Sequence, residues 1–419
     1  MSLATACDLR ARCDYRGALA ELVDADDLAA LLERSRLHEA LGNIADARID
    51  ATRALELGHG ASEARARLAG IARADGRPHD ALELLADVVG LDALVERAAA
   101  LEELARFAEA EELLRGIESD EPRIRHALNL TRGAIARDRG EYDDAEDALR
   151  AAIVYAEATF GPHSLETATA LNSLGMSCKY SGRFAEGIDL YRRALSIVVR
   201  AVGDAHSDVA SLYHNLGGIE HARRNFEQAE PYARRAVEIR RRSSGTDHPA
   251  VAEDEAAWAS ILHALGREDE AESLLRHALP MLEQTLGLEH PEVAAAWNNL
   301  AAILQRRGDY DGANVAYRRA LAAKEQVLGS NHPSLAITLN NLAVNARHRE
   351  RPDEAEALYL RTLAALKGVE PDHPTLLLAL RNYAKLLRSS GRSAEADDLE
   401  RRGKNTASGA VKRSSSKQP

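Results

Sequence analysis

Apolar residues recur along this chain at helical spacing, in paired blocks that a short polar turn separates. The stretch from Pro291 to His332 shows the pattern most clearly. Within each block its apolar and small residues lie three or four positions apart, which is the spacing of one helix face. They are Trp297, Leu300 and Leu304 in the first block and Ala313, Tyr317 and Ala320 in the second. Because Gly308-Asp309-Tyr310 separates the blocks, the pattern predicts a helix, a tight turn and a second, antiparallel helix.

The same unit recurs at a nearly constant period. Histidines in the connectors between units follow one another at steps of 43, 42, 42, 42 and 41 residues, at His163, His206, His248, His290, His332 and His373. A small residue in each second block keeps matching steps, at Gly187, Ala229, Ala271, Ala313, Ala355 and Ala396. A larger side chain there would hold the paired helices apart. Further upstream the small position continues at irregular steps, at Ala145, Ala110, Ala81, Ala47 and Ala18.

The motif Trp-x2-Leu-Ala, followed by Gly-x-Tyr-x2-Ala-x3-Tyr-x2-Ala-Leu, resembles the tetratricopeptide repeat (TPR) family, whose unit is a helix pair of about 34 residues. The longer second helix and the Gly-x2-His-Pro connector are similar to the repeats of kinesin light chains. The resemblance implies an all-α fold, a right-handed superhelical α-solenoid of about eleven helix pairs. The coiled-coil heptads of kinesin light chains are absent, so a role in carrying motor cargo does not follow.

Three regions are expected along the chain. Residues 1–160 form divergent helical repeats, and residues 161–402 form six regular repeats of about 42 residues. Residues 403–419 are rich in Ser, Gly and basic residues, and we expect them to be a disordered tail. This basic tail either contacts an acidic partner or is a solvated end.

The charge of the chain is unevenly distributed. Residues 1–150 carry 32 acidic and 20 basic side chains, whereas the remainder is balanced. An acidic half argues against nucleic acid as a partner, because binding to phosphates needs a basic face. No segment approaches the roughly 18 apolar residues of a membrane span, and the start lacks a signal-like apolar core. With three cysteines that suit a reducing compartment, we expect a cytoplasmic protein without membrane contact.

No catalytic signature is present in the sequence. A glycine-rich phosphate loop, a His-Glu-x2-His motif, a Cys-x2-Cys pair and a Gly-x-Ser-x-Gly elbow are all missing. The connector histidines cannot share a metal ion, because successive repeats stack at about 10 Å while zinc ligands lie within about 2.1 Å of the ion. We therefore predict no enzyme activity, no cofactor and no metal, and expect the histidines to hold the turns.

Carboxamides form a ladder on the first helix of successive units. At 100° per residue they point away from the face of Trp297, Leu300 and Leu304. In the similar repeats that face lines a concave groove that holds extended peptides. Carboxamides suit such a ligand because they donate and accept at once. The ladder consists of Asn172, Asn215, Asn298, Asn299, Asn340, Asn341 and Asn382. The alternative is that these residues only solvate the groove or tie neighbouring helices together.

The same face becomes basic toward the carboxyl end of the chain. Arg381, Lys385 and Arg388 are spaced by four and three residues, so they share one stripe of a helix. Such a stripe would favour carboxylates on a ligand. The alternative is that these residues form a solvated basic face without a ligand. The predicted basic residues of the groove are Arg306, Arg347, Arg381, Lys385 and Arg388.

These features predict a protein-interaction function. The leading hypothesis is a non-enzymatic adaptor or scaffold whose groove binds an extended acidic or amphipathic segment of a partner protein. The main alternative is a regulatory subunit or peptide sensor that controls an effector enzyme in trans through a change of the superhelix. An enzyme with a site assembled from scattered groove residues is a third hypothesis. Self-association stays open, because the acidic amino-terminal half could contact the basic region of a second copy.

Overall fold

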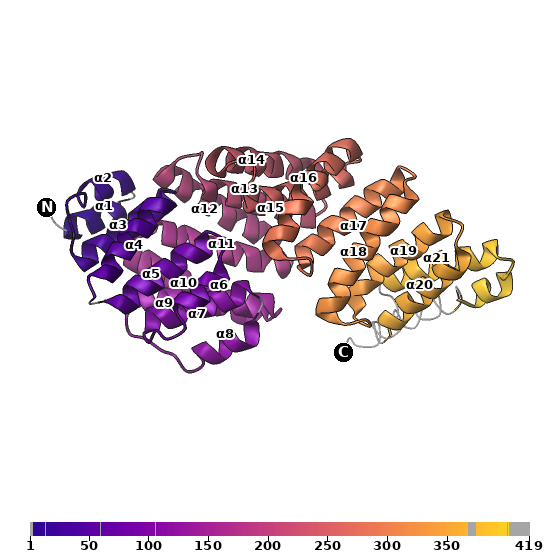
Figure 1. The fold of residues 1–419 in the computed structure, drawn as a ribbon, viewed down its shortest axis with the longest axis horizontal. Coiled ribbons are helices and arrows are strands. Elements are labelled where there is room, and N and C mark those ends of the chain that lie inside the picture. The colour runs from indigo at the N-terminus through magenta and orange to yellow at the C-terminus, as the bar shows by residue number, and fades with distance from the viewer. Residues whose placement is uncertain are drawn as a thin grey trace, which may run out of the picture. The chain divides into compact units, whose positions relative to one another are not determined.

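The helical pattern of the sequence is present throughout the part of the chain that the structure describes. The computed structural model describes residues 3–12, 14–58, 60–104, 106–367, 374–399 and 401. These residues form α-helices and one 3₁₀ turn, with consecutive helices packed as antiparallel pairs (Figure 1). The fold is therefore all-α, an α-solenoid of about eleven helix pairs, as the repeat predicted. The predicted tail, residues 403–419, and His373 lie outside the described residues.

The chain separates into two compact units, Met1–Ser244 and Gly245–Pro419, which we call unit 1 and unit 2. The helices of unit 1 are α1 (Leu3–Ala11), α2 (Tyr15–Ala20), α3 (Leu28–Ala40), α4 (Ile44–Glu56), α5 (Ala61–Ala74), α6 (Pro78–Leu84), α7 (Leu91–Glu103), α8 (Phe107–Leu114), α9 (Pro122–Asp138), α10 (Tyr142–Phe160), α11 (Leu165–Tyr180), α12 (Phe184–Val202), α13 (Ser207–Ala222) and α14 (Phe226–Ser244).

The helices of unit 2 continue the same alternation of first and second helices. They are α15 (Pro249–Ala264), α16 (Glu268–Leu286), α17 (Pro291–Arg306), α18 (Tyr310–Leu328), η1 (Pro333–Leu335), α19 (Ala336–His348), α20 (Pro352–Ala365) and α21 (Pro374–Ser389). Residues 393–399 are helical as well. The second helices α10, α12, α14, α16 and α18 are each 19 residues long, which confirms the extra length that the sequence predicted.

The small residues that recur in the second helices lie where paired helices cross. Every alanine predicted at this position, from Ala18 to Ala396, has 0% of its surface exposed. At Gly187 an added Cβ would lie 2.7 Å from Cδ1 of Ile219, so even a methyl group would require a shift. The core is consequently built from close backbone approach, filled by leucines and by three fully buried tyrosines. The tyrosines are Tyr191, Tyr317 and Tyr359.

The connectors that precede α15, α17 and η1 each contain a glycine with a positive φ and a proline in the first turn of the next helix. Gly287 has φ 85° and ψ 158°, and Gly329 has φ 79° and ψ 161°. Both glycines have a positive φ, but their extended ψ places them outside the left-handed helical region, in a region that is open essentially to glycine alone. Pro249 and Pro291 then occupy the first turn of the next helix, where a fixed φ is tolerated.

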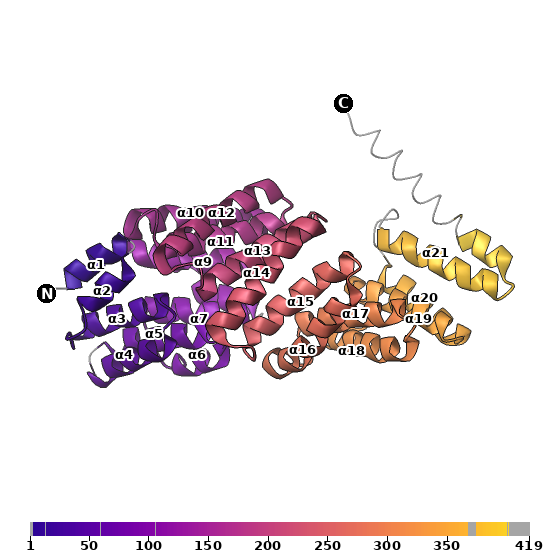
Figure 2. The ribbon, with the colours of Figure 1, turned by 90° about the horizontal axis from the view of Figure 1, so that it is seen from above.

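Unit 1 closes on itself. The Tyr15 hydroxyl accepts a hydrogen bond of 3.2 Å from the backbone N–H of Leu165, although 150 residues separate them. Leu165 and Ala201 pack against the apolar cluster of the first helix pair. The Arg10 guanidinium lies 5.6 Å from the centre of the Phe160 ring. The pair α1–α2 therefore contacts the segments around α10, α11 and α12 (Figure 2).

No helix in the described part of the chain is both long and apolar enough to cross a membrane. The division into compact units falls between Ser244 and Gly245 and does not test the predicted boundaries. The boundaries at residues 160 and 402 therefore stay predictions.

Candidate functional site

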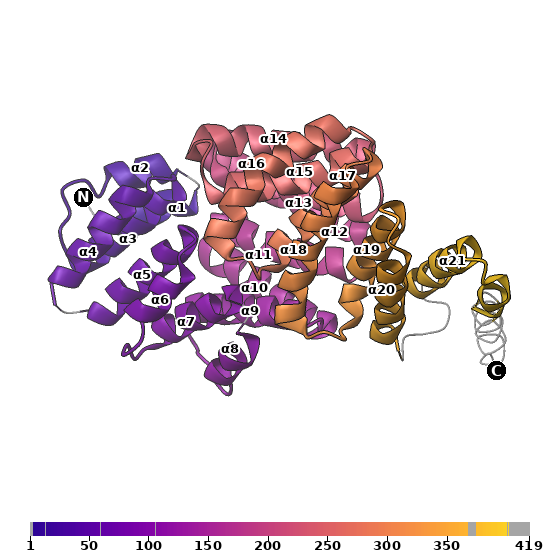
Figure 3. The same cartoon turned by 45° about the vertical axis from the view of Figure 1, so that its right-hand side comes forward.

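The predicted groove residues of unit 2 lie on three successive first helices, α17, α19 and α21 (Figure 3). Asn298 and Asn299 are half-buried on α17, as are Asn341 on α19 and Asn382 on α21. Asn340 is buried, with 3% of its surface exposed. Four of these five carboxamides thus have an environment between the packed core and open solvent, whereas Asn340 belongs to the buried interior.

Some of the carboxamides bond to one another across adjacent first helices. In unit 2, Nδ2 of Asn382 donates to Oδ1 of Asn340 at 3.1 Å. In unit 1, Nδ2 of Asn215 donates to Oδ1 of Asn172 at 2.8 Å. These bonds match the alternative in which the ladder ties neighbouring helices together. Each donating carboxamide keeps a second N–H and its own oxygen, so the bonds also orient groups that can contact a ligand.

Two of the predicted basic residues, Arg306 and Arg388, already have partners within unit 2. Arg306 donates to Nδ1 of His263 at 2.9 Å and to the His263 carbonyl at 3.0 Å, and it forms an ion pair with Glu268. Arg388 forms an ion pair of 2.9 Å with Asp397. Both guanidinium groups therefore already have carboxylate partners within unit 2, which weakens them as contacts for a ligand carboxylate.

Arg381 and Lys385 are the members of the basic stripe that form no ion pair among the described residues. They lie one turn apart on α21 and their side chains are exposed. Arg347 is half-buried near the end of α19, next to His348, whose ring stacks on Tyr310 at a centroid distance of 4.8 Å. Burial, with the Arg347 charge as a second cause, lowers the pKa of His348. Positive charge at this end of α19 is therefore supplied by Arg347.

Two exposed apolar residues on this face were missed by the sequence analysis. Ile337 and Leu378 have 54% and 39% of their surfaces exposed. Each lies four residues before a ladder carboxamide, Asn341 and Asn382 respectively, and therefore on the same helix face. The repeat period alone could have found them, since an apolar residue on the carboxamide face has no core to fill. The face consequently combines apolar, carboxamide and basic groups.

The connector histidines cap the helices that follow them. Nδ1 of His290 accepts the backbone N–H of Glu292 at 3.3 Å, and Nδ1 of His332 accepts that of Ser334 at 3.2 Å. His206 and His248 make the same bond. Ser164 is the cap of α11, whereas His206, and not the following Ser207, is the cap of α13. Within the described residues no cluster of potential metal ligands is present.

The fold of this chain is shared with solved structures of low sequence identity. The apo form of the quorum sensor NprR from B. thuringiensis is 13% identical, with a TM-score of 0.57 over 88% of this chain and 99% of that chain. A Rap protein complexed with competence and sporulation factor is 15% identical, with a TM-score of 0.53 over 84% of this chain and 99% of that chain. At such identities the likeness shows the fold alone.

A putative kinesin light chain from Podosopora anserina with TPR-like repeats is 22% identical, with a TM-score of 0.44 over 49% of this chain and 98% of that chain. No curated protein matches the sequence. The model of the tetratricopeptide repeat family matches residues 124–198, 208–284, 253–326, 292–368 and 334–405, which together cover more than half of the chain. The chain therefore belongs to the tetratricopeptide repeat family.

Proposed function

We propose that this protein is a non-catalytic adaptor that binds an extended segment of a partner protein on the carboxamide face of unit 2. The observation that carries the proposal is the combination of exposed groups on α19 and α21. Ile337 and Leu378 offer apolar contact, Asn341 and Asn382 offer donors and acceptors, and Arg381 and Lys385 offer positive charge. Such a face suits an amphipathic segment that carries carboxylates.

Each kind of group makes a different contribution to that binding. Apolar contact supplies affinity in proportion to the buried area. Carboxamides recognise a peptide backbone whatever its side chains are. The exposed cations add attraction that decreases with salt, because solvent ions screen charges at the surface. The proposed contacts are Ile337, Asn341, Arg347, Leu378, Arg381, Asn382 and Lys385, while Asn172, Asn215, Asn298, Asn299 and Asn340 act mainly by ordering the helices.

The test compares two double variants of the full chain. Arg381→Gln with Lys385→Gln removes the exposed cations from α21. Arg276→Gln with Arg361→Gln removes two partly exposed cations from the second helices α16 and α20 and serves as the matched control. A partner is captured with the wild-type chain, and the affinity of its binding segment is then measured for all three proteins at two salt concentrations.

We expect the α21 variant to bind at least tenfold more weakly and with less salt dependence, and the control variant to bind as the wild type does. Equal binding by the wild type and the α21 variant would show that the partner uses another surface. Circular dichroism of each variant verifies that the helices remain folded.

A regulatory peptide sensor is the second candidate. It is favoured by the likeness in fold to the quorum sensor NprR and to the Rap protein solved with competence and sporulation factor. In that case the bound peptide would shift the helix pairs and control an effector in trans. Solution scattering with and without the captured segment distinguishes the two functions. A sensor predicts a changed radius of gyration, whereas an unchanged radius contradicts the sensor and leaves the adaptor.

A further inference from the structure

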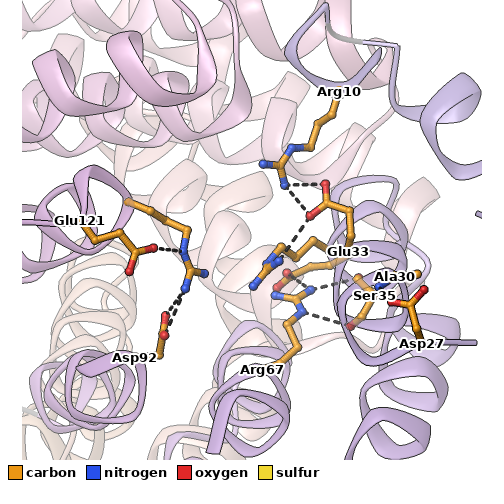
Figure 4. Close-up of polar contacts among 11 residues, drawn as sticks. Arg10, Asp27, Ala30, Glu33, Ser35, Arg67, Asp92 and Glu121 are labelled. Atoms are coloured by element: carbon orange, nitrogen blue, oxygen red, sulfur yellow. Dashed lines mark hydrogen bonds and ion pairs between the residues drawn. The ribbon is translucent and has the colours of Figure 1, made fainter. Parts of the chain in front are cut away.

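Arginines from four first helices converge on one space inside unit 1. They are Arg10 on α1, Arg36 on α3, Arg67 on α5 and Arg123 on α9. Figure 4 shows Arg10 and Arg67 reaching toward this space from different helices, with Glu33 near its centre and Asp92 and Glu121 on its other side. The acidic excess of residues 1–150 therefore does not extend to this space, where the cavity lining holds as many guanidinium groups as carboxylates.

Two of these arginines are held firmly by neighbouring helices. Arg67 donates from Nε to Oγ of Ser35 and from Nη2 to the Ser35 carbonyl, both at 3.0 Å, and it pairs with Glu39. Arg123 donates from Nη2 to both carboxylate oxygens of Asp92, at 2.9 and 3.1 Å. These bonds fix the two guanidinium groups in place and compensate much of their charge.

Arg36 is the member whose charge is least compensated. Its one hydrogen bond among the described residues is a contact of 3.3 Å from Nη1 to Oε2 of Glu33. The same carboxylate also accepts from Arg10 at 3.1 Å and pairs with it at 2.9 Å. One carboxylate charge is thus shared by two guanidinium groups, and most of the five N–H donors of Arg36 remain unused by these contacts.

Arg36 is desolvated and has other guanidinium groups close to it. Burial lowers its pKa, and the charge of Arg123 lowers it further, while Glu33 opposes both effects. Its side chain nevertheless keeps 34% of its surface exposed, so it is recessed in the groove but reachable from solvent. A charge that is desolvated and faces like charges favours an anion beside it.

A cavity lies directly against this arginine. Its volume is about 80 Å³, which suits a group of a few heavy atoms rather than a whole side chain. Of the three carboxylates in its wall, Asp92 is bonded to Arg123 and Glu96 to Arg73 at 2.6 Å, while Glu63 is exposed to solvent. The lining residues are Arg36, Glu63, Ala66, Arg67, Asp92, Glu96 and Arg123.

We propose that this cavity binds an oxyanion, the carboxylate or phosphoryl group of a ligand, and that Arg36 is the residue that contacts it. Arg67 and Arg123 are positioning residues that shape the cavity, because their own charges are paired with Glu39 and Asp92. The planar guanidinium of Arg36 can donate two parallel hydrogen bonds to either group. The site uses residues of unit 1 alone, so it stands independently of the surface proposed on unit 2.

The test uses the full chain and two probes, inorganic phosphate and a hexaglutamate peptide, each at an ionic strength held constant with chloride. Arg36→Gln removes the proposed contact. The control is Arg115→Gln, which removes an exposed arginine of the same unit that pairs only with the exposed Glu112 among the described residues. Calorimetric titration gives the affinity, and thermal melting gives the stability of each variant without the probe.

We expect the wild type and Arg115→Gln to bind at least one probe, and Arg36→Gln to bind it at least tenfold more weakly. Without the probe, Arg36→Gln should melt at the wild-type temperature or above, because the lost charge faces like charges. Binding of phosphate alone assigns a phosphoryl ligand, and binding of the peptide alone assigns a carboxylate. Either result supports the site.

Equal affinity of the wild type and Arg36→Gln, or no binding of either probe by the wild type, would overturn the proposal. A purely structural role predicts instead that Arg36→Gln melts earlier and leaves probe binding unchanged. If Arg36→Gln does not fold, Arg36→Lys keeps the charge and removes the paired donors. Weaker binding by that variant supports the site, and unchanged binding contradicts the assigned contact.

Discussion

The first repeats of unit 1 and the last repeats of unit 2 use the same kind of helix pair to build inner faces of different character. In unit 1, charged side chains cross from one first helix to the next, as in the pairs Arg67 with Glu39 and Arg123 with Asp92. In unit 2, the equivalent faces of α19 and α21 are joined by a short carboxamide bond between Asn382 and Asn340. The outward groups differ accordingly, with recessed arginines in unit 1 and exposed apolar and basic residues in unit 2.

This difference shows that the scaffold and the inner face vary independently. The scaffold depends on small residues at helix crossings, such as Ala110 in unit 1 and Ala313 in unit 2, which have no exposed surface in either unit. The inner face has few packing constraints, so it can carry ion pairs in the first repeats of unit 1 and carboxamide bonds between α11 and α13 and between α19 and α21. The net charge of a half-chain consequently says little about the charge that its groove presents.

The largest expected effect concerns Glu33, the shared partner of Arg10 and Arg36. The variant Glu33→Gln removes the carboxylate that Arg10 and Arg36 share, although the charge of Glu166 still acts on Arg10, and 5% side-chain exposure gives water little access to residue 33. Breaking such a buried pair destabilises by about 3 kcal/mol or more. Urea unfolding of unit 1 should therefore shift strongly to lower denaturant concentration.

The two units can be followed separately in that experiment. Both tryptophans of the sequence, Trp258 and Trp297, belong to unit 2. Tryptophan fluorescence thus follows unit 2, whereas circular dichroism follows both units. The fluorescence transition should be unchanged in Glu33→Gln, and the control Glu112→Gln should change neither signal. A shift of the fluorescence transition as large as that of the dichroism would show that the units unfold together and would break the comparison.

A smaller effect is expected from the pH dependence of unit 1. Burial, together with a hydrogen bond to Asp138, raises the pKa of Glu102 to about 7, and the nearby Arg137 acts against this. The folded state therefore holds a proton on Glu102 that the unfolded state loses above its ordinary pKa of 4.5. Stability from this group falls as pH rises from about 4.5 to 7 and is constant above that.

The variant Glu102→Gln removes this proton and its pH dependence. Relative to the wild type, the variant should gain about 2 kcal/mol of stability between pH 5 and pH 8, measured by urea unfolding followed with circular dichroism. Tryptophan fluorescence of unit 2 serves as the internal reference. A constant difference between the two proteins across that pH range would contradict the raised pKa.

The smallest effect tests whether the hairpin turns obey the same rule in both units. The turn between paired helices holds a glycine with positive φ in most repeats, as at Gly308 with φ 83°. Arg224 in unit 1 and Glu350 in unit 2 occupy this position with φ of 65° and 57°. Arg224→Gly and Glu350→Gly should each stabilise their unit by about 0.5–1 kcal/mol, because relief of the strained backbone exceeds the added chain entropy.

Thermal melting of the two glycine variants, followed by circular dichroism for Arg224→Gly and by tryptophan fluorescence for Glu350→Gly, measures both gains. A gain in one unit and a loss in the other would show that the turns are not equivalent. The matched control, Gly308→Ala, should destabilise unit 2, since alanine must adopt the same strained φ.

The sequence by itself determined the scaffold of this protein. The period of the connector histidines, the crossing alanines and the glycine–proline punctuation are local patterns, and local patterns act through helix geometry that needs no distant partner. They sufficed to predict helix pairs and their approximate number. The tetratricopeptide repeat model confirms the family from the same positions.

Only the tertiary structure decided which groove residues are already engaged and where charge gathers. Arg306 could not be known to bond His263 and Glu268, because that choice depends on side chains brought together from neighbouring repeats. The convergence of Arg10, Arg36 and Arg123 depends in addition on the closure of unit 1, in which Tyr15 meets Leu165. The physical reason is that ion pairing and burial depend on the distances between side chains in space. These distances result from small rotations that add up over successive repeats, and no single repeat encodes them.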